Sequence, residues 1–475
     1  MSSADSSDPT RIAARSSLVD SIKGCGVSGY RIDKQELKRR LLIPEYLRLA
    51  IKEAIHLKDS NVGDRFQKDE STQVPDAPMV VFVNSKSGGR HGPALKIRLQ
   101  ELMGEEQVFD LSDVKPKEFV QYGLVCLEKM ASRGDHCAKE TREKLRVMVA
   151  GGDGTAGWVL GSLSELYQKN RMPVPPTGII PLGTGNDLSR SFGWGGSFPF
   201  AWRAAIKKSL SNAITGPIRH LDCWNLTLSM PAGDKVKLPH CMSETEGRSL
   251  EQDFDVEGDL PTKMTCFEGL FYNYFSMGMD AQVAYGFHHL RDTKPYLAQG
   301  PISNKVIYST YSCTQGWFCT PCVSDPSLRG LKNIIRMQIK KINSSEWEHV
   351  PIPSSVRSIV FLNLHNYGGG RNPWGDLKPE YRQKKGLVEA QADDGVLEIF
   401  GMKQGWHASF VMVELISAKH IAQAAAIRIE IRGGDWKKTY LQMDGEPWKQ
   451  STNKDYSTFV EINRVQHQSL MISGD

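Results

Sequence analysis

Three short loops rich in glycine carry the groups of this sequence that could bind a phosphorylated ligand. The loop Gly151–Thr155 follows an apolar run and precedes a stretch with helical periodicity. Glycine has no Cβ, so the backbone there can turn sharply and approach a ligand closely. Free N–H groups at the start of the following helix would favour phosphate, and Asp153 and Thr155 supply the loop's polar side chains. A tight turn with nothing bound is the alternative when this loop is taken alone.

The other two loops also follow predicted strands. Asn84–Gly89 comes after the apolar run that begins at Met79, and Gly183–Asp187 comes after the strand predicted over 178–182. Strands that alternate with helices predict a parallel sheet with helices on both faces. Ligands bind beyond the carboxyl ends of such strands, so the three loops are expected to converge on one site. Walker-type and dinucleotide patterns are absent from this region, so a phosphate site of another kind is expected.

The pattern changes from about Arg219 onward. Apolar and polar residues alternate, and helical stretches no longer separate the predicted strands regularly. This alternation predicts a largely antiparallel second domain. The predicted strands are 223–228, 270–275, 334–342, 358–364, 397–402, 427–432, 439–443 and 458–463, with a helix over 406–421.

Taken together, the loops and several later segments resemble the diacylglycerol kinase family. Asn-Ser-Lys-Ser-Gly-Gly at 84–89, Gly-Gly-Asp-Gly-Thr at 151–155 and Leu-Gly-Thr-Gly-Asn-Asp at 182–187 resemble its catalytic domain. Segments 273–281, 366–375 and 443–448 resemble its accessory domain. The resemblance implies an α/β catalytic domain, a mainly antiparallel β-rich accessory domain, and an active site in the cleft between them. The expected divisions are 1–77 for a tail, basic helix and linker, 78–218 for the catalytic domain and 219–475 for the accessory domain.

The resemblance implies a reaction and roles for residues. The γ-phosphoryl group of ATP would pass to the free hydroxyl of diacylglycerol, giving phosphatidate and ADP, with Mg²⁺ neutralising charge. Asp444 matches the family's general base, and Asp153 would act near Mg²⁺ or the phosphates. Asp394 and the Val396 carbonyl match positions that hold a second, structural Mg²⁺ in some members. The nucleotide site would be lined by Asn84, Ser87, Gly88, Gly151, Gly152, Gly154, Thr155, Gly183, Thr184, Gly185 and Asn186.

Simpler interpretations stay open for several of these residues. Asp444 and Asp394 each precede a glycine, so each could be a plain Asp-Gly turn. Glu446 could bind metal or orient Asp444. Arg371, at the end of three glycines, could pair with phosphate, or its loop could be a flexible hairpin end.

Composition narrows the class of protein. The chain has 475 residues, a net charge of +5 and 40% hydrophobic residues, as expected for a globular protein of two to three domains. The charge is too small to suggest nucleic-acid binding, and the sequence holds neither a spanning apolar run nor a secretory signal. We therefore expect a cytoplasmic enzyme that meets its lipid substrate by peripheral membrane contact.

The cysteines give little sign of a metal site. Cys313, Cys319 and Cys322 have no suitably spaced fourth ligand, so free thiols are favoured over zinc. The first part of the chain has only Cys25 before Cys126, so the family's zinc-bearing diacylglycerol-binding modules are missing. The chain therefore resembles the short plant diacylglycerol kinases.

A basic amphipathic segment at 33–57, interrupted at Pro44, has two interpretations. It could contact anionic lipid, or it could pack on the next domain with its charges in water, which is favoured.

Two other functions compete with a lipid kinase. One is a soluble kinase of related fold acting on NAD or a sugar phosphate, and the other is a catalytically silent lipid-binding scaffold. Segments 366–371 and 444–448 favour the lipid kinase, and intact Asp153 and Asp444 argue against the scaffold.

Overall fold

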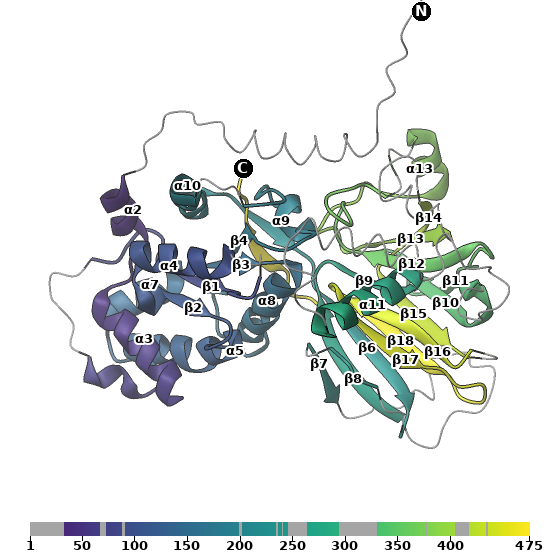
Figure 1. Cartoon of the computed structure of the whole chain (residues 1–475), viewed down its shortest axis with the longest axis horizontal. Coiled ribbons are helices and arrows are strands. Elements are labelled where there is room, and N and C mark those ends of the chain that lie inside the picture. The colour runs from purple at the N-terminus through teal and green to yellow at the C-terminus, as the bar shows by residue number, and fades with distance from the viewer. Residues whose placement is uncertain are drawn as a thin grey trace, which may run out of the picture.

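The computed structural model shows two parts that lie side by side, one of helices around a sheet and one dominated by two sheets (Figure 1). It describes residues 33–66, 73–87, 91–198, 202–233, 236–239, 241–245, 264–293, 330–373, 375, 378–403, 418–433 and 436–475. The predicted residue Gly88 and the cysteines at 313, 319 and 322 lie outside these ranges.

The first part is built on a six-stranded sheet of order β2-β1-β3-β4-β19-β5. The pairings from β2 to β19 are parallel, and β19 pairs with β5 in the antiparallel sense. Strands β1, β3 and β4 are buried along almost their whole length, as expected for strands covered on both faces. The strands are β1 (Met79–Val83), β2 (Val108–Asp110), β3 (Arg146–Gly151), β4 (Thr177–Pro181), β5 (Ile218–Leu221) and β19 (Ser469–Ile472).

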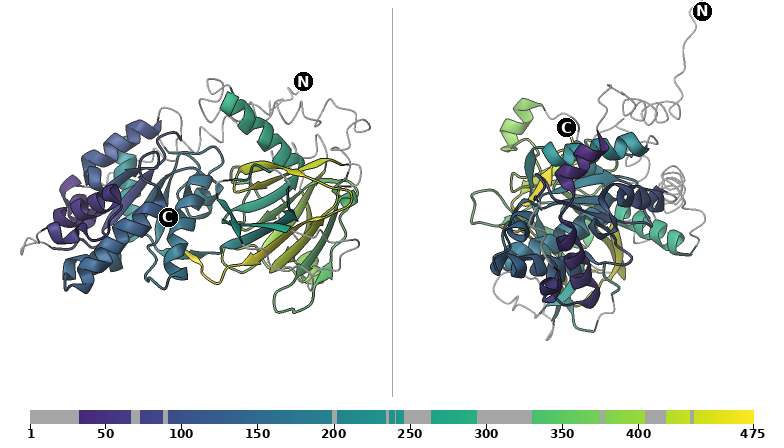
Figure 2. Two further views of the ribbon diagram at one scale, coloured as in Figure 1. Left: turned by 90° about the horizontal axis from the view of Figure 1, so that it is seen from below. Right: turned by 90° about the vertical axis from the view of Figure 1, so that its left-hand side faces the viewer.

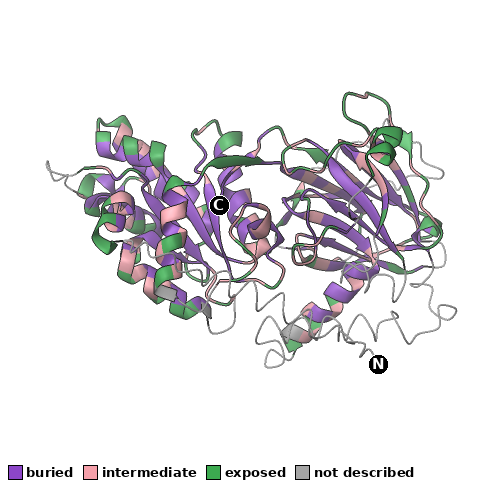
Figure 3. Cartoon of the chain, turned by 90° about the horizontal axis from the view of Figure 1, so that it is seen from above, coloured by how far each residue is buried: buried purple, intermediate pink, exposed green. Residues whose placement is uncertain are grey.

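Helices cover both faces of this sheet. Val80 and Phe82 of β1 pack in one core with α3, α6, α7 and α8, whereas Val81 and Val83 pack in another with α2, α4 and α10. The predicted largely parallel sheet with helices on both faces is confirmed, and the helices expose their outer sides (Figure 3). The α-helices are α2 (Lys34–Leu41), α3 (Glu45–Leu57), α4 (His91–Met103), α5 (Pro116–Glu118), α6 (Leu124–Ser132), α7 (His136–Lys144), α8 (Asp153–Gln168), α9 (Asp187–Ser191) and α10 (Trp202–Thr215), with 3-10 turns at Val62–Arg65 and Glu105–Gln107 and a π-helical turn at Phe119–Gly123.

The last strand of the chain completes this first sheet. β19 inserts between β4 and β5, beside the C-terminus in Figure 1. The sheet therefore combines strands from the expected catalytic segment with strands from the segment expected to form the accessory domain. The expectation of a parallel sheet is wrong at one edge, because β5 runs antiparallel to β19.

The basic segment at the start packs on the first part. Its two helices stop and restart around Pro44, as predicted. Leu41 of α2 and Leu47 of α3 are buried in the two cores on either face of the six-stranded sheet. Arg48 pairs with Glu106 at 3.0 Å. The favoured interpretation, a helix packed on the next domain, is confirmed, while lipid contact through the outer basic side chains stays a prediction.

Leu47→Ala is expected to lower the free energy of unfolding by about 2–5 kcal/mol, because it removes a fully buried side chain and leaves a cavity. The side chain of Leu47 is 0% exposed. Urea unfolding followed by circular dichroism would measure the loss. Leu49→Ala on the same helix is the control, because Leu49 is 38% exposed, and it should change stability by less than about 0.5 kcal/mol. Equal losses in both variants would contradict this packing of α3.

The second part contains two antiparallel sheets that share one core. Their orders are β11-β10-β15-β18-β6-β8-β7 and β14-β13-β12-β9-β16-β17. Leu226 and Ile429 of the first sheet pack with Phe275 and Ile359 of the second, so the predicted antiparallel, β-rich domain is confirmed. Helix α11 packs against β16 and β17 (Figure 2). The elements are β6 (Trp224–Pro231), β7 (Met242–Thr245), β8 (Met264–Phe271), β9 (Tyr274–Gly278), α11 (Met279–Thr293), a 3-10 turn (Leu331–Asn333), β10 (Ile335–Lys340), β11 (Glu348–His349), β12 (Val356–Leu362), α13 (Pro379–Lys385), β13 (Leu397–Lys403), β14 (Lys419–Ala424), β15 (Ala426–Ile431), β16 (Lys438–Met443), β17 (Glu446–Ser451) and β18 (Thr458–Arg464).

Most strands predicted for this part are confirmed, as β6, β10, β12, β13, β15, β16 and β18. The prediction of one strand over 270–275 is wrong, because β8 ends at Phe271 and β9 begins at Tyr274 in the other sheet. The predicted helix over 406–421 falls mostly outside the described residues, and its last residues belong to β14. Among the described residues, the helices are too short or too polar to cross a bilayer.

Candidate active site

The three predicted loops meet at the carboxyl ends of β1, β3 and β4. The Asn84 amide donates a hydrogen bond to Thr155 Oγ1 at 3.0 Å, which joins the first loop to the second. Gly183 lies so close to the second loop that a Cβ on it would stand 2.6 Å from Gly152 Cα. A side chain there would force the loops apart, which is a physical reason for glycine. The predicted convergence of the loops is therefore present in the structure.

Asn186 shapes the third loop from within. It has a left-handed backbone with φ 55°, which asparagine tolerates better than most residues. Its side-chain oxygen accepts from Gly183 N at 2.9 Å, and its amide donates to the carbonyls of Gly183 and Gly196. The buried Asn186 side chain thus holds the backbone that was predicted to line the nucleotide site.

Asp153 connects the second loop to the third. It is the first residue of α8, and its carboxylate accepts from Asp187 N at 2.9 Å and Leu188 N at 3.1 Å, the first two residues of α9. Burial, with the nearby charge of Asp187, raises the pKa of Asp153 to about 7. Asp153 therefore fixes the start of a neighbouring helix as well as presenting a carboxylate to the site.

Asp187 is a site residue to which the sequence assigned no role. Its Oδ1 accepts from the backbone N–H groups of Gly369 and Gly370, both at 2.6 Å. Burial raises the pKa of this carboxyl. The three glycines Gly368–Gly370 all have positive φ, and this conformation lets successive N–H groups converge on one acceptor. Asp187 thus joins the glycine loop of the second part to the three loops of the first part. Within the glycine loop, the guanidinium of Arg371 donates to Gly368 O.

Asp444 lies in the tight turn between β16 and β17. It and Gly445 both have positive φ, 47° and 86°, as in a two-residue hairpin turn, so the turn interpretation is correct for the backbone. Its side chain does more than close the turn. Oδ1 accepts from Asn273 N and Tyr274 N, and Oδ2 accepts from Tyr272 N, at 2.8 to 2.9 Å.

Burial dominates the electrostatics of Asp444. It raises the pKa of the carboxyl to about 6, against the opposing effect of the three backbone donors and with added repulsion from Glu446. Such a group is ionised at neutral pH and still basic enough to take a proton.

The Asp444 turn lies against the helix that follows the second loop. A Cβ placed on Gly157 of α8 would be 3.3 Å from Asp444 Oδ2, and one on Gly154 would be 3.6 Å from Asp444 O. The charge of Asp444 also raises the pKa of Asp153. Residues 444 and 153, far apart in the sequence, are therefore neighbours in the fold.

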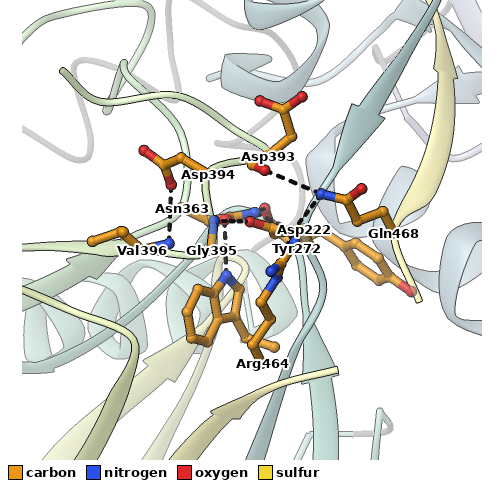
Figure 4. Close-up of polar contacts among 10 residues, drawn as sticks. Asp222, Tyr272, Asn363, Asp393, Asp394, Gly395, Val396, Arg464 and Gln468 are labelled. Atoms are coloured by element: carbon orange, nitrogen blue, oxygen red, sulfur yellow. Dashed lines mark hydrogen bonds and ion pairs between the residues drawn. The ribbon is translucent and has the colours of Figure 1, made fainter. Parts of the chain in front are cut away.

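Asp394 has a local role in the structure. Its carboxylate accepts from Val396 N at 2.9 Å, which closes an Asx turn (Figure 4). It also accepts from Gln391 N at 3.1 Å. Burial raises its pKa to about 6. Among the described residues, no three acidic, histidine or cysteine side chains cluster in a way that could hold a metal. The second Mg²⁺ at Asp394 and Val396 stays a prediction.

Family models match both parts of the chain. The model described as "Diacylglycerol kinase catalytic domain" matches residues 78–218, and "Diacylglycerol kinase accessory domain" matches 270–447. The chain belongs to the diacylglycerol kinase family. Diacylglycerol kinases 7 and 4 of Arabidopsis thaliana are 62% and 61% identical to it, each over 98% of this chain and over 96% and 98% of their own length. Diacylglycerol kinase theta of Homo sapiens is 30% identical over 79% of this chain and 33% of its own length.

Membership of this family assigns the reaction class. The chain is a lipid phosphotransferase that uses ATP, so the function implied by the family resemblance is confirmed. The kinases of NAD or sugar phosphates and the silent scaffold are correspondingly disfavoured.

Proposed function

We propose that this diacylglycerol kinase carries out its reaction between its two parts, with Asp444 as the general base. The observation that supports the proposal most is that Asp444, held by three backbone N–H groups, lies against the helix that begins at Gly151–Thr155. One part offers the phosphate loops and the other offers the acidic group. This juxtaposition supports an active site between the two parts.

The nucleotide would bind at the three loops. The backbone N–H groups around Gly151–Thr155 stand at the N-terminus of α8, where the helix dipole favours phosphate. Gly152 and Gly183 keep that surface free of side chains, so the phosphates can approach the backbone closely. Asn84 and Thr155, already hydrogen-bonded to each other, would adjust to contact the nucleotide.

The acidic residues fit a divalent cation. A Cβ on Gly185 would lie 3.5 Å from Asp187 Oδ2 and 3.7 Å from Asp153 Oδ2, so the two carboxylates face the same space. Burial raises the pKa of both carboxyls, and the charge of Asp187 adds to the shift of Asp153. A bound cation would offset this accumulation of negative charge. Mg²⁺ is typically held by one or two carboxylates together with substrate phosphates. Asp153 and Asp187 would hold it here, and when bound it would neutralise charge on the transferring group.

Asp444 would act on the lipid hydroxyl. Its ionised carboxylate accepts the hydroxyl proton while the hydroxyl oxygen forms a bond to the γ-phosphorus, and the bond from that phosphorus to the β,γ-bridging oxygen breaks. The products are phosphatidate and ADP, and the proton resides on Asp444 until solvent removes it.

Because diacylglycerol resides in membranes, this chemistry requires peripheral contact with a membrane. The exposed basic side chains of α2 are the proposed anionic-lipid contact.

The test is product analysis with [γ-³²P]ATP, Mg²⁺ and mixed micelles of diacylglycerol, with NAD and hexose phosphates assayed in parallel. Label in phosphatidate is the expected result. Label in NADP or a sugar bisphosphate would replace the proposal with a soluble-substrate kinase, and absence of transfer to any acceptor would support a silent scaffold. Omission of Mg²⁺ should abolish the transfer, since the paired carboxylates then face the triphosphate without a counterion.

A further inference from the structure

The chain passes between the two parts through two short connections that lie together. The first connection links β5 to β6 and contains Asp222. The second spans residues 465–468, between Arg464 at the end of β18 and the start of β19. Val465 N donates to Cys223 O at 2.8 Å, so the two connections are hydrogen-bonded. Figure 4 shows the side chains of Arg464 and Gln468 both directed at Asp222.

Asp222 uses all of its polar atoms at this junction. Oδ1 accepts from Arg464 Nε at 2.8 Å and Gln468 Nε2 at 2.9 Å, and Oδ2 accepts from Gly395 N at 2.6 Å. Its backbone N donates to Ala392 O. The carboxylate is 0% exposed and the Arg464 side chain is 38% exposed. A buried charge with this many donors fixes the segments that supply them.

Asn363 connects Asp222 to the backbone next to Asp444. Its amide donates to Asp222 O at 2.9 Å and to Tyr272 O at 2.7 Å, and its backbone N donates to Asn273 O at 2.9 Å. Its side-chain oxygen accepts from Trp224 Nε1. Asn363 therefore holds the carbonyl groups of Tyr272 and Asn273.

The N–H groups of those same two residues hold Asp444. Tyr272 N and Asn273 N each donate to the Asp444 carboxylate at 2.8 Å. The backbone of Tyr272 and Asn273 thus lies between Asn363 on its carbonyl side and Asp444 on its donor side. A shift of Asn363 would move the donors that orient the carboxylate.

We propose that Asp222, Arg464 and Asn363 are positioning residues, which act through the backbone of Tyr272 and Asn273 to orient the Asp444 carboxylate. The inference rests on the proposed role of Asp444. It predicts an effect on turnover rather than on nucleotide binding, because the network contacts the backbone that holds the base and not the loops at Asn84 and Gly151–Thr155.

Asn363→Leu keeps the approximate size of the side chain and removes its side-chain hydrogen bonds to Asp222 O, Tyr272 O and Trp224 Nε1. We expect kcat to fall about tenfold or more, since a misplacement on the order of 1 Å can cost ~10²-fold, while KM for ATP stays within about threefold. In a double-mutant cycle, Asn363→Leu added to Asp444→Asn should lower kcat no further, because the two residues act as one unit. Multiplicative losses, or an unchanged kcat in the single variant, would overturn the inference.

Arg464→Gln is the second variant, for the case in which Asn363→Leu does not fold. Its partly exposed side chain makes this change milder. It should lower kcat in the otherwise unmodified enzyme and should lower it no further when Asp444→Asn is already present. Arg464→Lys keeps the positive charge opposite Asp222 and should recover most of the lost kcat. Arg219→Gln, on an exposed residue of β5 beside the same junction, is the matched control and should retain full turnover. Equal kcat in Arg464→Gln and Arg464→Lys would overturn the inference.

The two proposals fail in different ways. If Asp444→Asn alone keeps near-normal turnover, the role of Asp444 as base is wrong. If Asp444→Asn abolishes turnover and the losses multiply, the base stands and the positioning network does not.

Discussion

Asp444→Asn is expected to lower kcat for phosphatidate formation by about 10²- to 10⁴-fold, the usual contribution of a positioned general base. The asparagine keeps one oxygen, which can accept from Asn273 N and Tyr274 N as Oδ1 does now. It also tolerates the left-handed backbone at this position. The loss should therefore appear in chemistry, with KM for ATP little changed and with an unaltered circular dichroism spectrum.

The pH profile of the unmodified enzyme gives a second measurement of the same role. Burial raises the pKa of Asp444 to about 6. A general base acts in its ionised form, so turnover should be full above this pH and should fall tenfold per pH unit once the pH drops below it. The acid limb should be missing from the residual activity of Asp444→Asn. An unchanged acid limb in the variant would assign that titration to another group.

Asp455→Asn provides the matched control. Asp455 is an exposed carboxylate in the turn that precedes β18, in the same domain, and its substitution should leave kcat unchanged. Near-normal turnover in Asp444→Asn, with this control also normal, would remove Asp444 from the mechanism.

The sequence predicted those features that depend on local pattern. Alternating apolar residues predicted strands such as β15, whose alternate side chains Ile427 and Ile429 enter the core, and glycines after apolar strands predicted the three phosphate loops. The run 270–275 was misjudged as one strand because its apolar and aromatic residues surround a single polar one, Asn273, with no glycine or proline to mark a break. The chain leaves one sheet at Phe271 and enters the other at Tyr274, and apolarity alone cannot show which sheet a buried residue joins.

Features that depend on distant partners could not be predicted. The four residues of β19 carry little strand signal of their own, and their neighbours β4 and β5 lie far earlier in the chain. Asp187 could be seen at the end of a glycine loop, but its acceptance of the Gly369 and Gly370 N–H groups joins residues more than 180 positions apart. Asp394 shows the converse limit, since its Asx turn was foreseeable locally and its metal was suggested by resemblance alone.

Asp153→Asn is the second substitution with a large expected effect, a fall in kcat/KM for ATP of about tenfold or more. Asp187 N and Leu188 N bond to different oxygens of the carboxylate, and asparagine has an NH₂ group in place of one of them, so one of the two hydrogen bonds is lost. Loss of a hydrogen bond to a charged group costs about 1.5–3 kcal/mol, and about 1.4 kcal/mol corresponds to tenfold in rate. The start of α9 would move, and with it Asp187, while the negative charge available to Mg²⁺ would be lost. Asp135→Asn is the control, because Asp135 caps α7 by the same kind of bond outside the three loops.

Stability against pH separates this role from a merely structural cap. Burial and the charge of Asp187 raise the pKa of Asp153 from its ordinary value of 3.8 to about 7 in the folded enzyme. Its ionisation therefore works against folding, and the enzyme loses stability as the pH rises from about 4 to 7. Asparagine cannot ionise and escapes this loss. In EDTA, Tm of Asp153→Asn relative to the unmodified enzyme should therefore rise across that window. A flat difference would make Asp153 an ordinary helix cap, whereas a rising one accompanied by lost activity would mean that the enzyme keeps a destabilising carboxylate where its nucleotide and metal need one.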